Sequence, residues 1–125
     1  MSEHISDLKY ILQGIMAEND DIEGMTIVSV QGLPIVSLFN DTTINDSLVS
    51  AMAAAILSVG ERASNELKRG KMKRTLIESD QGQLVLTQAG DSAILVTLVK
   101  KDAGLGIVFM LLDSAIKKIV KLLDE

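Results

Sequence analysis

The sequence offers few side chains that could act as a general base or a nucleophile. Its one histidine, His4, lies in the expected first turn of a terminal helix, where a solvated role is the simpler interpretation because a proton shuttle needs an ordered pocket. Ser6 and Lys9 have the Ser-x-x-Lys spacing of some acyl-transfer enzymes, but neither Ser-Asp-Asn nor Lys-Thr-Gly follows to complete such a site. Acyl transfer is therefore not predicted.

Phosphate-binding and metal-binding patterns are also incomplete. Gly104 and Gly106 have the spacing that opens a dinucleotide-binding turn, but Phe109 stands where the third glycine should be, and no Gly-x-x-x-x-Gly-Lys-Ser/Thr occurs. The carboxylate pairs fall in loops that we expect to be solvated, and the absence of cysteine excludes thiolate chemistry. We predict no catalytic residues, no cofactor and no metal, and hence no enzyme.

One strongly basic stretch remains, with five cations in seven residues: Lys68, Arg69, Lys71, Lys73 and Arg74. Cations at the end of a helix complement its dipole, and cations on an edge strand discourage aggregation. The alternative is a basic rim that meets an acidic partner. The positions of these cations favour the role at the helix end and the strand edge, and they leave the basic rim open as the alternative.

Composition limits the class of partner. With 125 residues the chain fits a single domain, residues 1–125. A net charge of −5 and 2% aromatic residues disfavour a nucleic-acid partner, which needs a basic surface and stacking platforms. The apolar runs are too short to cross a bilayer, and the N-terminus lacks the pattern of a secretory signal. We expect a cytoplasmic protein without a transmembrane segment.

Hydrophobic periodicity predicts an α+β chain in the order αββαβββα. Helical spacing marks residues 5–15, 46–69 and 105–123, with Thr43 or Asn45 capping the second helix and Gly70 ending it. Turn residues separate five expected strands, at 25–30, 35–39, 72–78, 83–89 and 92–99. The fifth strand is almost wholly apolar and should lie at the centre of the sheet, whereas the polar third strand should lie at an edge.

The second helix has two faces that could each pack. At about 100° per residue its larger apolar side chains share one stripe, which we expect to face the core: Leu48, Met52, Ala55, Ile56, Val59, Ala63 and Leu67. The opposite face carries Leu57 among small residues, which permit close approach of another backbone. We therefore predict a dimer or partner interface at Ser50, Ala53, Ala54, Leu57, Gly60, Glu61, Ser64 and Lys68.

Four segments, at residues 22–35, 52–63, 82–87 and 105–106, occur in a characteristic order. In that order and spacing the chain resembles the Roadblock/dynein light chain family over residues 8–115, and within it the prokaryotic MglB-like regulators of small GTPases. The resemblance implies a five-stranded antiparallel sheet of order 2-1-5-4-3 flanked by helices, a longin/profilin-like α/β/α sandwich.

The resemblance also implies how the chain assembles. Family members form dimers in which the third strands pair across the axis and the second helices lie side by side. Transferred to this sequence, the dimer edge strand comprises Met72, Lys73, Arg74, Thr75, Leu76, Ile77 and Glu78.

Two functions follow from the resemblance. The first is a homodimeric protein that binds a Ras-like small GTPase through the paired second helices, as a scaffold or as a regulator that stimulates GTP hydrolysis, with Arg62 and Arg69 contributing to docking. The second is a nucleotide-insensitive structural adaptor in a larger motor or membrane-associated complex. Nucleotide-dependent binding would discriminate the two.

Overall fold

The computed structural model of the protein describes residues 4–124. The elements follow the predicted order αββαβββα: α1 (Ile5–Glu18), β1 (Ile22–Ser29), β2 (Pro34–Phe39), α2 (Asp46–Glu66), β3 (Arg74–Ser79), β4 (Gly82–Ala89), β5 (Ala93–Val99) and α3 (Leu105–Leu123).

The five strands form one antiparallel sheet in the order β2-β1-β5-β4-β3. The apolar strand β5 is central, and all of its residues except Leu98 are buried. β3 forms one edge, and among residues 4–124 it pairs with β4 alone. The predicted α+β class, sheet order and placement of these two strands are confirmed.

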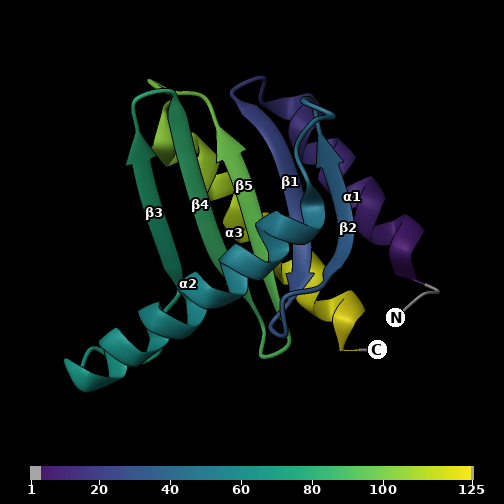
Figure 1. The fold of residues 1–125 in the computed structure, drawn as a ribbon. Helices are drawn as coiled ribbons and strands as arrows, with labels where there is room; N and C mark the ends of the chain where they lie inside the picture. The colour runs from purple at the N-terminus through teal and green to yellow at the C-terminus, as the bar shows by residue number, and fades with distance from the viewer. Residues whose placement is uncertain (1–3, 125) are drawn as a thin grey trace.

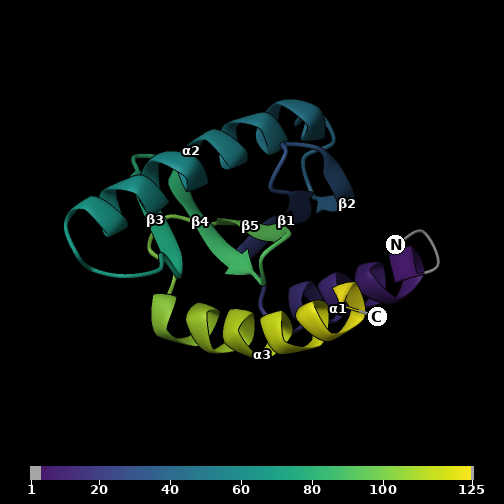
Figure 2. The ribbon, with the colours of Figure 1, turned by 90° about the horizontal axis from the view of Figure 1, so that it is seen from below.

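Helices cover both faces of the sheet, and the coverage is unequal. Figure 2 shows α1 and α3 together beneath the sheet and α2 alone above it. A large core cluster lies on the α1/α3 side and includes Leu12, Ile27 and Leu112. A smaller cluster beneath α2 contains Val28, Ala53, Leu57, Met72, Leu86, Ile94 and Val96.

The predicted orientation of α2 is wrong. Leu57 is only 5% exposed and packs on the sheet, while Leu48, Met52, Val59 and Leu67 of the supposed core stripe are exposed. The helix therefore presents its small-residue face to the sheet and its larger apolar side chains to solvent. Close packing explains why the small-residue face contacts the strands, because small side chains let the helix axis approach the sheet.

Gly60 shows why small residues are needed beneath α2. A Cβ added at Gly60 would lie 2.5 Å from the sulfur of Met72, so the glycine leaves the space that this side chain fills. The Thr75 hydroxyl donates to the same sulfur at 3.2 Å. Met72 is buried under α2, and β3 accordingly begins at Arg74 rather than at Met72 as predicted.

The N-terminal end of α2 has a favourable capping residue, whereas the C-terminal end has a lysine at a position that favours glycine. The side chain of Asn45 accepts a hydrogen bond from the Leu48 amide at 3.1 Å, as an N-cap should. At the other end the amide of Lys68 donates to Asn65 O and that of Arg69 donates to Ser64 O. These two bonds form a Schellman motif whose left-handed residue is Lys68, with φ 60°, so the prediction that Gly70 ends the helix is wrong.

We predict that Leu57→Ala lowers the free energy of unfolding by about 2–4 kcal/mol, because it removes a buried side chain that the helix cannot move inward to replace. Met52→Ala, on the exposed side of the same helix, should change it by less than about 0.5 kcal/mol. Urea titration at one fixed protein concentration measures both. Equal losses for the two variants would contradict the orientation of α2.

Lys68→Gly should raise the free energy of unfolding by about 1 kcal/mol, because glycine adopts the left-handed conformation without steric cost. The matched control is Gly70→Ala, which should lower the free energy of unfolding, because alanine is strained at the φ of 88° that Gly70 adopts. No neighbouring atom lies within 4 Å of an added Cβ, so the backbone conformation is the only cost. Thermal melting of both variants tests the sign. A destabilised Lys68→Gly would show that the lysine side chain itself supports the helix end.

Candidate interaction surfaces

The first candidate surface is the helix stripe, the exposed apolar side chains of α2. Leu48 is 58% exposed, Met52 50%, Val59 70% and Leu67 68%, and the stripe also includes Ala55 and Ala63. Four large apolar side chains on one face of a helix are more than scattered surface residues explain.

An uncovered part of the sheet adjoins the helix stripe. Strand pairing aligns Ile77, Leu84, Leu98, Gly24 and Phe39 in one row across the sheet, on the α2 side. The Phe39 ring lies over Gly24, where an added Cβ would be 2.6 Å from the ring. We call the four side chains of this row the apolar shelf: Phe39, Leu98, Leu84 and Ile77.

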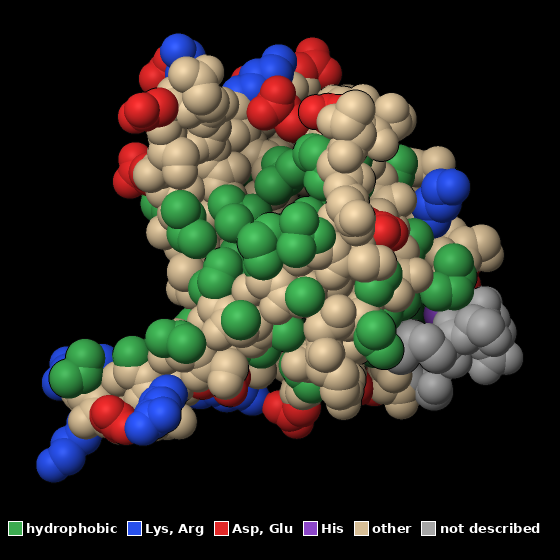
Figure 3. All heavy atoms as spheres, viewed as in Figure 1, with side chains coloured by type: hydrophobic (Ala, Val, Ile, Leu, Met, Phe, Trp, Pro, Cys, Tyr) green, Lys and Arg blue, Asp and Glu red, His purple; other side chains and the backbone are tan. Residues whose placement is uncertain are grey.

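The helix stripe and the apolar shelf form one surface. Half-buried Val49 and Ile56 of α2 pack against the same core cluster as Leu84 and lie between the two. Figure 3 shows hydrophobic side chains gathered on the sheet beside α2 and continuing along the helix. The sequence pattern does not predict this shelf, because the shelf depends on which strand positions lie beyond the reach of α2.

The open edge of β3 is the second candidate surface. Leu76 and Ile77 are 37% and 36% exposed, and no strand of the described chain pairs with this side of β3. An edge with unpaired backbone groups and exposed apolar side chains is a template for another strand. The predicted edge position of this strand is therefore confirmed, and the role of residues 72–78 in a dimer stays a prediction.

The C-terminal end of α2 extends past this edge. In Figures 1 and 2 the helix crosses the sheet obliquely, and its last turns project beyond β3. Residues 65–71 are all exposed, and Arg62 pairs with Glu66 at 3.1 Å. We call the last turns of α2 together with its C-terminal motif, residues 62–69, the overhang.

Charges are segregated along β3. Lys71, Lys73 and Arg74 lie where the strand begins, and Glu78 and Asp80 lie where it ends. Arg74 pairs with Asp113 of α3 and stacks on Phe109, its guanidinium carbon 4.4 Å from the ring centre.

The basic end of β3 opens into a cleft of about 790 Å³ between the sheet and α3. The Nε of Arg74 is buried there without a hydrogen-bond partner. Lys71 donates to Asp91 at 2.8 Å, and this bond raises the pKa of Lys71 and lowers the pKa of the Asp91 carboxyl. Lys71 is thus held in an ion pair within the chain.

The predicted interface residues of α2 divide into two groups. Ser50, Ala53 and Leu57 are buried in the chain's own core, so their predicted role in contacting another protein is wrong. Ala54, Gly60, Glu61 and Ser64 are half-buried along the same inner face, and Lys68 is exposed at the end of the helix. Participation of this second group in an interface stays a prediction.

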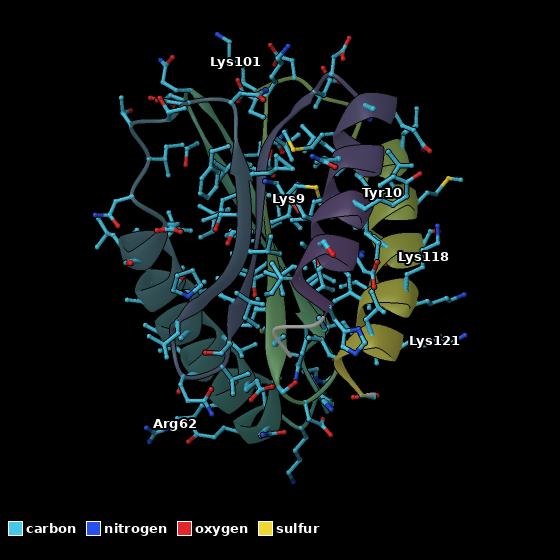
Figure 4. The ribbon with its side chains drawn as sticks, turned by 90° about the vertical axis from the view of Figure 1, so that its right-hand side faces the viewer. Lys9, Tyr10, Arg62, Lys101, Lys118 and Lys121 are labelled. Carbon is cyan, nitrogen blue, oxygen red and sulfur yellow. The ribbon has the colours of Figure 1, made fainter. Side chains whose placement is uncertain are left out.

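A further groove of about 310 Å³ runs between α1 and α3, with Tyr10, Ile11, Leu111 and Lys118 among its walls. Figure 4 shows Tyr10 on α1 beside α3, and Lys118 and Lys121 pointing outward from α3. Tyr10 is 76% exposed. The groove lies on the opposite side of the sheet from the helix stripe.

Within residues 4–124 the structure contains no cluster of three or more metal-ligating side chains. None of the helices in that range is long and apolar enough to span a membrane.

Comparison with protein-family models matches residues 10–99 to the Roadblock/LC7 domain. Two uncharacterised proteins of Methanocaldococcus jannaschii are each 31% identical to this chain, over 82% of this chain and 88% of their own length.

Solved structures show the same fold. MglB of Myxococcus xanthus superposes with a TM-score of 0.90 over 98% of this chain and 91% of its own, at 15% identity. A profilin, LokiProfilin1, solved in complex with rabbit actin, superposes with a TM-score of 0.63 over 94% and 96%, at 17% identity. The longin/profilin-like class predicted from the sequence is confirmed.

Proposed function

The chain belongs to the Roadblock/LC7 domain family, and on this premise we propose that it is a homodimeric regulator or scaffold of a Ras-like small GTPase. Proteins of this family are regulatory and adaptor proteins that work through contact. The observation that carries the proposal is the helix stripe, a row of large apolar side chains that the chain's own fold leaves in solvent.

The proposed homodimer uses the open edge of β3. Pairing two copies along this edge would join the sheets and satisfy the unpaired backbone groups of both strands. Each overhang then extends over the second copy, which brings the C-terminal part of one helix stripe, including Val59 and Leu67, beside α2 of the second copy. Burial of these side chains and of Ile77 would contribute to the stability of the dimer.

The proposed GTPase surface is the other half of the helix stripe. Leu48 and Met52 lie toward the start of α2, away from the overhang, and remain in solvent in such a dimer. The GTPase is assigned as the partner class from the resemblance to MglB-like regulators. The proposed location is the cytoplasm, and stimulation of GTP hydrolysis would come from repositioning residues of the GTPase, since the chain offers no catalytic constellation of its own.

We predict that Met52→Glu weakens GTPase binding about tenfold or more and leaves the dimer intact, because an unpaired carboxylate buried in an interface costs more than about 1.4 kcal/mol. Ser58→Glu is the matched control, since it adds the same charge to an exposed position outside the stripe. Binding is measured by biolayer interferometry with the small GTPases of the source cell, loaded with GTP analogue or GDP. Size-exclusion chromatography and circular dichroism check assembly and fold.

Binding that depends on nucleotide and is lost only in Met52→Glu supports the proposal. Equal affinity for the GTP and GDP forms would favour the structural adaptor instead. Wild-type protein that binds none of the GTPases would overturn the regulatory role.

A further inference from the structure

We propose that the charges of β3 fix both the register of the dimer and the choice of a second copy as the partner. In this register the two β3 strands pair antiparallel, with Arg74 opposite Glu78 of the second copy and Leu76 opposite Leu76 of the second copy. The inference rests on the proposed homodimer and goes beyond it, because it names the pairs that specify the contact.

The backbone decides which residues of β3 can pair outward. The amide of Gln88 on β4 donates to the carbonyl of Lys73 at 3.0 Å, so Lys73 directs its backbone groups toward β4. Successive residues of a strand direct these groups to opposite edges. Arg74, Leu76 and Glu78 therefore offer their N–H and C=O groups to the open edge.

The side chains restrict the register further. Arg74 contacts α3, so Arg74, Leu76 and Glu78 share the α1/α3 side of the sheet. A twofold axis perpendicular to the sheet keeps each side of one copy continuous with the same side of the other. Residues directly opposite each other must then have side chains on the same side of the sheet, so members of this set of three can only face one another, because a slip of one residue would reverse every side chain.

Among the allowed registers, one pairs all three outward residues. With Leu76 on the axis, Arg74 faces Glu78 of the second copy twice, once on each side of the axis. A slip of two residues would place Ile77 on the axis and set Leu76, rather than Arg74, opposite Glu78.

The charges favour the same answer. Antiparallel pairing sets the basic end of each β3 against the acidic end of the other, whereas parallel pairing would set like charges together. Asp113 contacts one terminal nitrogen of the Arg74 guanidinium, so the side chain has further N–H groups with which to pair a second carboxylate. Another family member without this polarity would leave Arg74 or Glu78 without an opposite charge, which is how a charged interface discriminates against wrong partners.

Single cysteines test the register, since the chain has no cysteine of its own. Leu76→Cys should form a disulfide with its own copy, because residues directly opposite in this kind of pair have Cα atoms about 5.5 Å apart, within disulfide range. Ile77→Cys should not, because its counterpart lies two residues further along, beyond about 7 Å. Non-reducing electrophoresis after mild oxidation of the dimer measures the cross-linked fraction.

The outcomes separate the register from the dimer. Cross-linking of Ile77→Cys instead of Leu76→Cys, or of neither in a chain that is dimeric, overturns the register and leaves the homodimer standing. A wild-type chain that stays monomeric at every concentration overturns the proposed homodimer itself.

Charge reversal tests partner choice. Glu78→Arg and Arg74→Glu should each raise the dissociation constant of their homodimers at least tenfold, because each sets two like-charge pairs at the seam. Mixed together, the two variants should form heterodimers with near wild-type affinity. In the heterodimer one native pair of Arg74 and Glu78 remains, and at the other site the introduced arginine faces the introduced glutamate. Native mass spectrometry counts the species. Asp20→Arg makes the same change in charge as Glu78→Arg, at an exposed turn, and should leave the homodimer unchanged.

Arg74 also pairs with Asp113, so Arg74→Glu is repeated together with Asp113→Arg, which restores the internal pair with its signs reversed. Preferential heterodimers with either form support the proposal. Random mixing of the variants at wild-type affinity would show that these charges do not select the partner.

Discussion

The sheet has two apolar faces, and the chain supplies two helices for one face and a single helix for the other. This imbalance determines most of what is exposed. The buried strand β5 must be shielded on both sides. α1 and α3 cover one side, whereas α2 crosses the other side obliquely and leaves the apolar shelf beside it and an overhang beyond β3. The surfaces available for contact are the parts of the second face that one helix cannot reach.

The same imbalance explains what could be predicted from the sequence. Element order and sheet order depend on apolar runs, turn residues and the family resemblance, and each strand carries enough of these signals to be placed. The central position of β5 follows from its wholly apolar sequence, and the edge position of β3 from its charges. These features reflect burial of whole elements, which a sequence records directly.

The orientation of α2 was not predictable in the same way. Both faces of this helix are apolar enough to pack, and periodicity alone favours the face with the larger side chains as the core face. What decides the outcome is shape: Ala53 and Gly60 allow α2 to lie close to the strands, and Met72 from beyond the helix fills the space that Gly60 leaves. The contribution of Met72 depends on a contact between residues distant in sequence, and helical periodicity does not contain it. The apolar shelf is not predictable from the sequence for a related reason. Its residues alternate normally along their strands, and they are exposed because α2 does not extend over them.

The overhang has a consequence for the energetics of local opening. Its backbone is held by its own helical hydrogen bonds, one exposed Arg62–Glu66 pair and a Schellman motif built on a lysine in a left-handed conformation. No strand of the described residues lies beneath its projecting turns to add the burial that usually stabilises a helix. In a lone chain these last turns therefore open at little cost in free energy, and amide exchange there is fast compared with the turns over the sheet. Assembly would raise that cost, so that exchange protection at the end of one helix reports whether a second chain is present.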